Sequence, residues 1–399
     1  MMTKPLRIAL IMQGGSDWIG GTEYIKNLIL ALGSLPIAVR SSFELCLVSS
    51  KSVDPSLHQQ LEPYINEIYY QEDIEPRIFL SRVKWKLIKT VFNQPSPQID
   101  TFIKRAKIDF IYPYLTPNKG KKYYQSAAWI PDFQHKHLTH YFSETEIQRR
   151  EQAHQYATRY SAIVVLSSKH AAKEFKDFFP EAAEKAKVLS FRTYSLPDWY
   201  EADPTEIQTK YKLPDRFFVI SNQFWRHKNH LLVFEALNLL KKKSIYPIVV
   251  CTGKIYDYRQ PEYSDTIKQS LQQLDIEQQV PLLGLIPKLD QVQLVRRSLG
   301  IIQPSLFEGW STVVEDARVL GKPIVLSDFP VHLEQNPPNS MFFERHSPES
   351  LAIILADWWE RLTPGPNLEQ ETTARKNNIN DVRTFAEQFI AIARGSCNK

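Results

Sequence analysis

An acidic turn around residue 308 offers the clearest candidate chemistry in the sequence. After an apolar run the chain reads Pro-Ser-Leu-Phe-Glu-Gly-Trp-Ser-Thr, from Pro304 to Thr312. A strand that ends at Pro304 and a helix that begins near Ser311 would place Glu308 on the turn between them. Ser and Thr are good N-cap types, and free N–H groups at a helix start suit a phosphate or a sugar hydroxyl. An ordinary capped helix with a solvated acidic first turn gives the same local pattern.

A basic turn within residues 220–230 is the second candidate. Arg226 and Lys228 fall between an apolar strand pattern and the start of a helical pattern. Cations in that position could neutralise a phosphate-bearing leaving group. The alternative interpretation is a basic helix cap on a solvated loop.

A glycine-containing loop, residues 13–23, follows the first expected strand and opens a helix. Glycine lets the backbone approach a ligand closely, but paired glycines before a helix are weak support by themselves. The spacing here does not match the Gly-x-Gly-x-x-Gly dinucleotide fingerprint.

A histidine-rich loop, residues 129–138, follows another expected strand. Its histidines have no carboxylate or cysteine at ligand spacing, so the sequence predicts no metal site. The alternative to a functional histidine is a loop histidine bonded to the backbone.

Short apolar runs alternate with helical patterns along the whole chain, which predicts parallel sheets and a doubly wound α/β architecture. The expected strands are residues 6–13, 43–49, 108–114, 127–131, 162–167, 187–191, 217–221, 247–252, 280–283, 300–304 and 323–326. The expected helices include residues 21–35, 229–243, 263–274, 289–298, 312–320 and 372–394. Prolines interrupt the strand and helix patterns at 195–204 and again at 363–366. We therefore expect domains at 1–200 and 201–370 and a terminal helix within 371–399.

Composition excludes several classes of protein. The 399 residues are 43% hydrophobic and 23% charged, which is typical of a globular protein. No apolar run could span a bilayer, and the short apolar stretch near the start is too brief for a secretory signal. The net charge of +5 is small for a nucleic-acid binder. Three scattered cysteines favour a reducing compartment, so we expect a cytoplasmic protein.

Residues 79–92 form a basic helical pattern with two apolar stripes. Such a helix could rest on an anionic membrane, which would make the protein peripheral to the inner membrane face. The alternative is a packed helix with a solvated basic edge.

The acidic segment resembles the Glu-x7-Glu segment of retaining GT-B glycosyltransferases, in particular glycosyltransferase family 4, the group 1 glycosyl transferases. The residues in register are Pro304, Ser305, Glu308, Gly309, Gly321 and Pro323. The other segments follow in the family's order, so the resemblance covers nearly the whole chain. It implies a GT-B fold, with an acceptor-side domain, a nucleotide-sugar domain facing it across a cleft, and a last helix that packs back on the first domain.

The resemblance also implies roles on the donor side. Glu308 would bond the transferred sugar, and Asp316, at the place of the family's second acid, would hold the ribose. Asp316 is one methylene shorter than the family's Glu, so Glu315 is the alternative. The remaining donor contacts implied are Gly309, the backbone of Trp310, Ser311 and Thr312 for the sugar and diphosphate, and the backbone near Ile286 for the base.

In the basic turn the resemblance puts Lys228 on the diphosphate. The family's Arg is replaced by Gln223, which carries no charge, so Arg226 is the candidate to supply it.

In the first domain, Gly20 and Gly21 match the family's glycine pair beside donor phosphate and acceptor. His135 matches the histidine that points at the donor sugar, with His137 and His140 as less favoured alternatives. Asp132 would orient that loop or contact the acceptor. The implied catalytic residues are therefore Glu308, His135 and Lys228.

The resulting expectation is a retaining, metal-independent hexosyltransferase. It would move a sugar from a nucleotide-diphosphate sugar to a carbohydrate or lipid-linked acceptor, in polysaccharide or glycolipid assembly, with no other cofactor and no nucleic acid. One alternative is a nucleotide-sugar-binding protein with little or no turnover, motivated by Gln223 and Asp316. The other is a GT-B-like sugar-nucleotide epimerase, against which the order of the segments argues.

Overall fold

The computed structural model describes residues 4–15, 18–74, 97–115 and 123–397. These residues form two compact units. The first contains residues 1–132, 148–194 and 380–399, and the second contains residues 133–147 and 195–379. The domain boundaries expected from the sequence remain predictions. The basic helix expected at 79–92 lies outside the described residues.

The first unit is built on a seven-stranded parallel sheet in the order β3-β2-β1-β4-β5-β6-β7. Its strands are β1 (Leu6–Ile11), β2 (Phe43–Ser49), β3 (Glu67–Tyr70), β4 (Phe110–Tyr112), β5 (Gln125–Ile130), β6 (Ile163–Leu166) and β7 (Ala186–Val188). The helices in this part of the chain are α1 (Ile19–Gly33), α2 (Ile37–Arg40), α3 (Pro55–Leu61), α4 (Gln71–Ile74), α6 (Pro97–Arg105), α8 (Glu144–Tyr160) and α9 (Lys169–Phe178).

The second unit repeats the design with a six-stranded parallel sheet in the order β10-β9-β8-β11-β12-β13. Its strands are β8 (Phe218–Ser221), β9 (Val249–Thr252), β10 (Leu282–Gly284), β11 (Ile301–Gln303), β12 (Ile324–Ser327) and β13 (Ser340–Phe343). Its helices are α7 (Gln134–His137), α10 (Asp198–Glu201), α11 (Pro204–Lys210), α12 (His230–Lys241), α13 (Tyr263–Leu274), α14 (Lys288–Arg297), α15 (Thr312–Leu320), α16 (Pro330–Gln335) and α17 (Pro348–Arg361). The last helix, α18 (Leu368–Cys397), contributes residues to both units.

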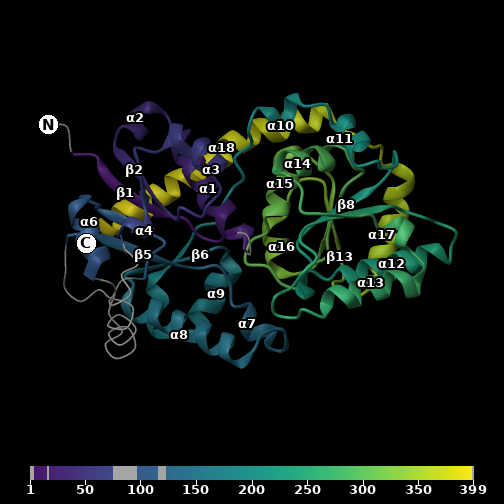
Figure 1. Ribbon diagram of the computed structural model, residues 1–399, viewed down its shortest axis with the longest axis horizontal. Helices are drawn as coiled ribbons and strands as arrows, with labels where there is room; N and C mark the ends of the chain where they lie inside the picture. The colour runs from purple at the N-terminus through teal and green to yellow at the C-terminus, as the bar shows by residue number, and fades with distance from the viewer. Residues whose placement is uncertain (1–3, 16–17, 75–96, 116–122, 398–399) are drawn as a thin grey trace. The chain divides into compact units, whose positions relative to one another are not determined.

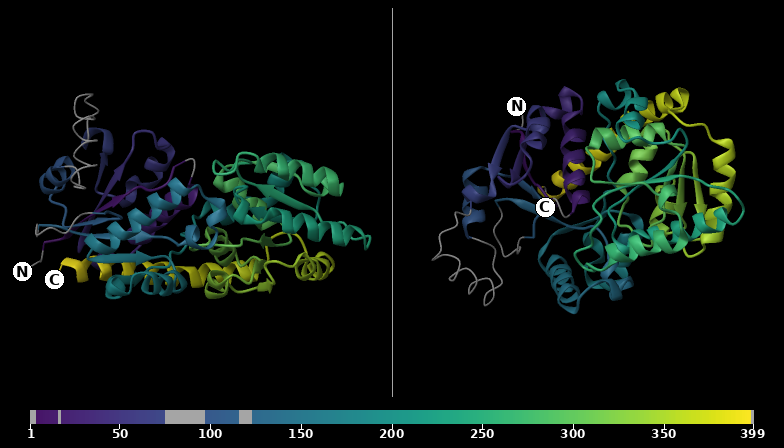
Figure 2. Two further views of the ribbon diagram at one scale, coloured as in Figure 1. Left: turned by 90° about the horizontal axis from the view of Figure 1, so that it is seen from below. Right: turned by 45° about the vertical axis from the view of Figure 1, so that its right-hand side comes forward.

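Alternation along the strands gives the second sheet two apolar faces. Phe218 and Ile220 of β8 belong to a core with α12, α13 and α17, whereas Val219 belongs to a core with α14 and α15. Successive side chains of a strand point to opposite faces, so helices must cover both sides. Helices lie on both sides of each sheet in Figures 1 and 2, which confirms the predicted doubly wound architecture.

Every strand and helix expected within the described residues has a counterpart in the structure, and the helices α13 and α15 begin and end where expected. Two strands were missed, β3 and β13, each at an edge of its sheet. Both are four residues long and only partly buried, so neither shows a clear apolar period.

A buried ion pair anchors the start of α18 within the second unit. Arg296 of α14 donates to both carboxylate oxygens of Glu371, at 2.7 and 3.1 Å, and both side chains are under 10% exposed. The ammonium of Lys322 lies nearby and donates to three backbone carbonyls, those of Arg296, Ser298 and Gly365. Farther along α18, Phe389 packs edge-on against Phe110 and Tyr112 of β4.

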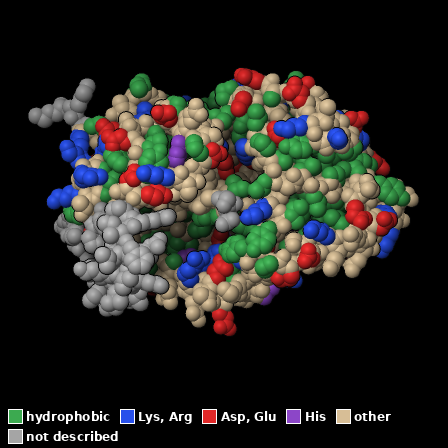
Figure 3. All heavy atoms as spheres, in the orientation of Figure 1, with side chains coloured by type: hydrophobic (Ala, Val, Ile, Leu, Met, Phe, Trp, Pro, Cys, Tyr) green, Lys and Arg blue, Asp and Glu red, His purple; other side chains and the backbone are tan. Residues whose placement is uncertain are grey.

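The face drawn in Figure 3 carries Lys and Arg side chains interspersed with Asp and Glu over both units, in keeping with the small net charge. Among the described residues, no helix is long and apolar enough to cross a bilayer.

Candidate functional site

The carboxyl ends of β8 and β11 bring the acidic and basic turns together. The two strands are neighbours in one parallel sheet, and the loop after each leaves the same edge. The ammonium of Lys228 lies 2.6 Å from Oε1 of Glu308, and the two side chains are 15% and 9% exposed. Two of the three expected catalytic residues therefore form one largely buried ion pair.

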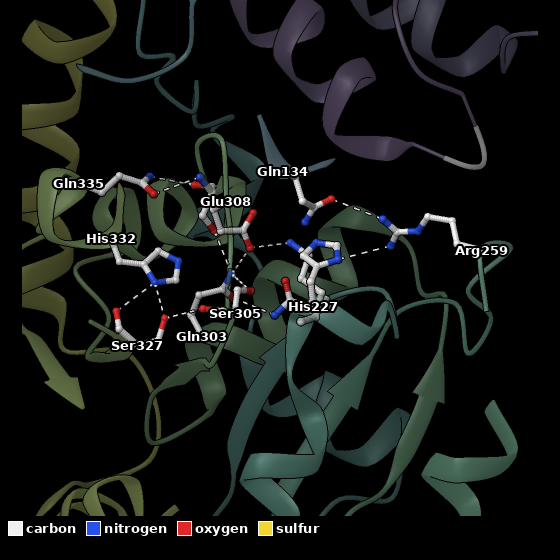
Figure 4. A network of polar contacts seen from close by, with 12 residues as sticks. Gln134, His227, Arg259, Gln303, Ser305, Glu308, Ser327, His332 and Gln335 are labelled. Atoms are coloured by element: carbon white, nitrogen blue, oxygen red, sulfur yellow. Dashed lines mark hydrogen bonds and ion pairs between the residues drawn. The ribbon is translucent and has the colours of Figure 1, made fainter. Parts of the chain in front are cut away.

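Gln303, at the end of β11, fixes the Glu308 carboxylate from below. Its fully buried amide donates to Oε1 of Glu308 at 2.9 Å and to the hydroxyls of Ser305 and Ser311 at 3.1 and 3.2 Å. The amide oxygen accepts from Nδ2 of Asn222, 2.8 Å away. A buried network with every member bonded holds its parts in one geometry. Figure 4 shows Glu308 above Gln303 and Ser305.

This environment keeps Glu308 ionised. Burial alone raises the pKa of its carboxyl, but the nearby ammonium of Lys228 and the bonds from Lys228 and Ser305 outweigh burial, so the pKa is lowered. A fixed negative charge at the edge of the sheet can accept hydrogen bonds from hydroxyls or stabilise developing positive charge.

Gln335 of α16 secures the start of α15. It accepts from the N–H of Ser311 at 3.0 Å and donates to the Ser311 carbonyl and to Glu315, both also at 3.0 Å. Glu315 is buried and pairs with Arg318 as well. An anion can therefore reach the Ser311 N–H only by displacing the side chain of Gln335. The carboxylate of Glu315 is already bonded to Gln335 and Arg318 inside the protein.

Asp316 has a different surrounding. Its carboxylate lies 2.5 Å from the ammonium of Lys288, which sits over the ring of Trp199. Lys288 begins α14, directly after the loop that contains Ile286, and Ile286 packs against the core on this side of the sheet. The residues expected at ribose and base therefore occupy adjoining positions, but Asp316 already has a cationic partner.

The basic turn does not present two free cations to a diphosphate. Lys228 is paired with Glu308, and Arg226 donates to Gln260 while its guanidinium lies over Tyr141. Gln223, the residue in place of the family's Arg, has a buried Nε2 with no hydrogen-bond partner among the described residues.

A pair that the sequence analysis missed, Asp257 and Arg259, ties residues 133–147 to the second unit. Arg259 is bonded bidentately to Asp257, at 2.9 and 3.1 Å, and both side chains are nearly inaccessible. The same guanidinium contacts Gln134 at 3.4 Å and Nδ1 of His227 at 3.4 Å, as Figure 4 shows. An Asp-x-Arg sequence after a strand is the only signal the sequence offered for this contact.

The expected histidine lies next to this contact. His135 is fully buried in α7, adjacent to Gln134, whereas His137 and His140 are exposed. The ring of His137 lies 5.3 Å from that of Phe307, the residue before Glu308. His135 and the Glu308 turn thus belong to one unit, while Asp132 belongs to the other.

In the first unit, Gly21 makes room for an aromatic ring. A methyl group on Gly21 would lie 2.8 Å from Cε3 of Trp18, and Trp18 stacks on Trp129 with ring centres 5.4 Å apart. Gly20 lies beside the same indole. The packing of Trp18 explains the absent side chain at Gly21, and the expected contacts of both glycines with donor phosphate remain predictions.

His230, the first residue of α12, gives a pH-dependent expectation. It is fully buried, stacks on Phe224 at 4.1 Å, and neither ring nitrogen has a partner among the described residues. Burial, with the charge of Lys228, lowers its pKa from 6.5 to about 3. Between those values the unfolded chain binds a proton that the folded chain does not, so the free energy of unfolding falls as pH falls.

We expect the replacement His230→Phe, which keeps the stacked ring, to remove this contribution. The wild type should lose up to about 1.4 kcal/mol per pH unit more than the variant between pH 6.5 and 4. Urea unfolding of both proteins at pH 6.5, 5.5 and 4.5 measures the difference. Parallel losses in the two proteins would contradict the assignment.

Among the described residues, no group of three or more His, Cys, Asp or Glu side chains is arranged to hold a metal ion.

Comparisons with known proteins bear on the family and on the fold. Residues 203–371, which lie in the second unit, match the family described as glycosyl transferases group 1. No curated protein matches the sequence.

Several solved structures match over nearly the whole chain. Anabaena HepE in complex with UDP and glucose is 17% identical, with a TM-score of 0.65, and 98% of this chain and 100% of that one are covered. Sucrose-phosphate synthase from Thermosynechococcus elongatus is 15% identical, with a TM-score of 0.66 and 98% of each chain covered. WaaG, a glycosyltransferase involved in lipopolysaccharide biosynthesis, is 12% identical, with a TM-score of 0.59 and 95% of each chain covered. These likenesses establish the two-domain α/β GT-B fold.

Proposed function

We propose that this protein is a retaining glycosyltransferase that moves a sugar from a nucleotide-diphosphate sugar to an acceptor hydroxyl. The observation that carries the proposal is the Glu308 carboxylate, held ionised by Lys228 and oriented by a hydrogen bond from Gln303, at the carboxyl edge of the sheet in the part of the chain that matches the group 1 family. UDP-glucose is the first donor to test, because HepE was solved with that molecule bound.

The proposed reaction breaks the bond between the anomeric carbon and the diphosphate oxygen, and its electron pair leaves with the diphosphate. The acceptor oxygen bonds to the same face of the sugar, and the leaving diphosphate takes the acceptor's proton. Glu308 would accept a hydrogen bond from the transferred sugar, and Asp316 would accept hydrogen bonds from the ribose hydroxyls. His135 would face the sugar from the loop that Arg259 contacts. As the donor binds, the ammonium of Lys228 would leave the Glu308 carboxylate and pair with the diphosphate instead.

The setting we propose is polysaccharide or glycolipid assembly in the cytoplasm, with residues 79–92 as a peripheral membrane contact and Asp132 on the acceptor side. The support for this setting is the resemblance to family 4 and the role named for WaaG. No divalent metal is proposed to take part.

Thermal unfolding with UDP, GDP, ADP and their glucose conjugates in the presence of EDTA tests the proposal. A ligand at a hundred times its Kd stabilises a protein by about 2.7 kcal/mol. We expect UDP and UDP-glucose to raise the melting temperature, and UDP-glucose to be hydrolysed slowly to UDP. If no nucleotide shifts the transition and none is hydrolysed, the proposal is wrong.

A second candidate, a donor-binding protein with little turnover, is favoured by the neutral Gln223 and by the existing partners of Arg226 and Lys228. Such a protein would bind UDP-glucose and release no sugar.

Replacing Gln223 with arginine separates the two candidates. A cation at this position would stabilise the leaving diphosphate, so Gln223→Arg should raise the rate of UDP release about tenfold. Gln223→Met, which adds no charge, is the matched control. If UDP release is slow in wild type and equally slow in both variants, the lack of a positive charge at residue 223 is not the cause of the low rate.

A further inference from the structure

His332 of α16 lies beside the Glu308 turn and has no role in the function proposed so far. The residue follows β12, the strand next to β11, and its side chain is fully buried. Figure 4 shows its ring between Ser327 and Glu308.

The hydrogen bonds of Ser327 settle which ring nitrogen of His332 carries a proton. The Ser327 hydroxyl donates to the carbonyl of Ser305 at 2.6 Å, so its only proton is already used. Nδ1 of His332 lies 2.9 Å from that hydroxyl oxygen and 3.1 Å from the Ser327 carbonyl, and both oxygens can only accept from it. Nδ1 is therefore the N–H nitrogen.

It follows that the other nitrogen, Nε2, is a bare acceptor. Burial lowers the pKa of His332 to about 4, so the ring is neutral near pH 7 and has no second proton. Nε2 is buried without a hydrogen-bond partner among the described residues. In Figure 4 it points to the side on which Glu308 lies.

Nε2 of His332 is thus an unpaired acceptor, among the described residues, on the side of its ring that faces Glu308. A buried acceptor left unpaired costs about 1–3 kcal/mol, and a group that donates a hydrogen bond would recover that free energy. A sugar hydroxyl is such a donor, whereas a fluorine, a methoxy group or a hydrogen in its place is not.

We propose that Nε2 of His332 accepts a hydrogen bond from one hydroxyl of the transferred sugar, beside Glu308, and so makes that hydroxyl a requirement for the donor. The inference rests on the proposed function and adds the sugar group that the site recognises. His332 is then a specificity-determining residue.

The test compares wild type with His332→Phe on UDP-glucose and its 2-, 3-, 4- and 6-deoxyfluoro analogues, by kcat/KM for UDP release. We expect wild type to disfavour one analogue by about 10- to 100-fold relative to the others. His332→Phe should lose activity on UDP-glucose and treat that analogue and UDP-glucose alike, with UDP binding unchanged. His332→Gln, which keeps an acceptor, should retain part of the preference.

A purely structural role would change the melting temperature or UDP binding and leave the pattern across the analogues as in wild type, and that result would overturn the inference. If His332→Phe does not fold, His332→Met, which also lacks the nitrogen acceptor and adapts to irregular space, takes its place. If wild type neither binds UDP nor acts on UDP-glucose, the proposed function fails and the inference falls with it. If wild type is active and the variant shows the same relative kcat/KM across the analogues as wild type, the inference about His332 is wrong while the proposed function stands.

Discussion

Replacing Glu308 with glutamine should lower the rate of sugar transfer or donor hydrolysis at least a hundredfold, with little change in the affinity for UDP. Glutamine has nearly the same shape, and its oxygen can still accept from the amide of Gln303. The negative charge is lost, however, and the largely buried ammonium of Lys228 is left without its carboxylate. Removing one preorganised charge or hydrogen-bond partner from a transition state costs about 100- to 1,000-fold in rate.

The measurement is UDP release from UDP-glucose under single-turnover conditions, together with UDP binding by calorimetry. Glu277→Gln, an exposed carboxylate in the same unit, is the control and should behave as wild type. Unchanged turnover in Glu308→Gln would show that the carboxylate only holds Lys228 in place. Loss of UDP binding in parallel with turnover would indicate that the turn had rearranged.

The largest effect on stability is expected at Glu371. In Glu371→Gln the buried guanidinium of Arg296 loses its bidentate partner. Burial lowers the pKa of Lys322 to about 7, and the variant also removes the Glu371 charge that partly opposes this lowering. Breaking a buried pair by removing one partner destabilises proteins by about 3–5 kcal/mol, because the other charge stays buried. We expect a loss of that size in the free energy of unfolding.

Urea unfolding followed by circular dichroism measures this loss. Glu369→Gln, two residues away on the exposed side of α18, is the matched control and should differ from wild type by less than about 0.5 kcal/mol. Equal midpoints for the two variants would mean that the carbonyls around Lys322 and Arg296 already compensate their charges.

The fold was predictable because the central strands of both sheets are continuous apolar runs. β8, β9 and β12 are buried on both faces, so their composition alone identifies them. β3 and β13 lie at the sheet edges and are only partly buried, so their sequences are not continuous apolar runs and do not identify them as strands.

The site was predictable in part for a similar reason. Once β8 and β11 are adjacent parallel strands, the turns with Lys228 and Glu308 must meet at one edge. Their direct pairing was not predicted, and neither were Gln303 and Arg259, because each depends on which side chain faces which across the sheet. A glutamine that ends an otherwise apolar strand, as Gln303 does, could have indicated a buried polar network, although no prediction was based on it.

The grouping of residues 133–147 with the second unit matters for exchanging parts between related enzymes. A hybrid that joins residues 1–194 of this chain to the donor half of a relative would separate Gln134 and Phe142 from Arg259. The relative's donor half would then pack against residues 133–147 of this chain without the matching Arg259, and the mismatched contact would lie next to His135. Hybrids that transplant residues 133–147 and 195–379 together keep this contact, so the natural segment to exchange is discontinuous in sequence.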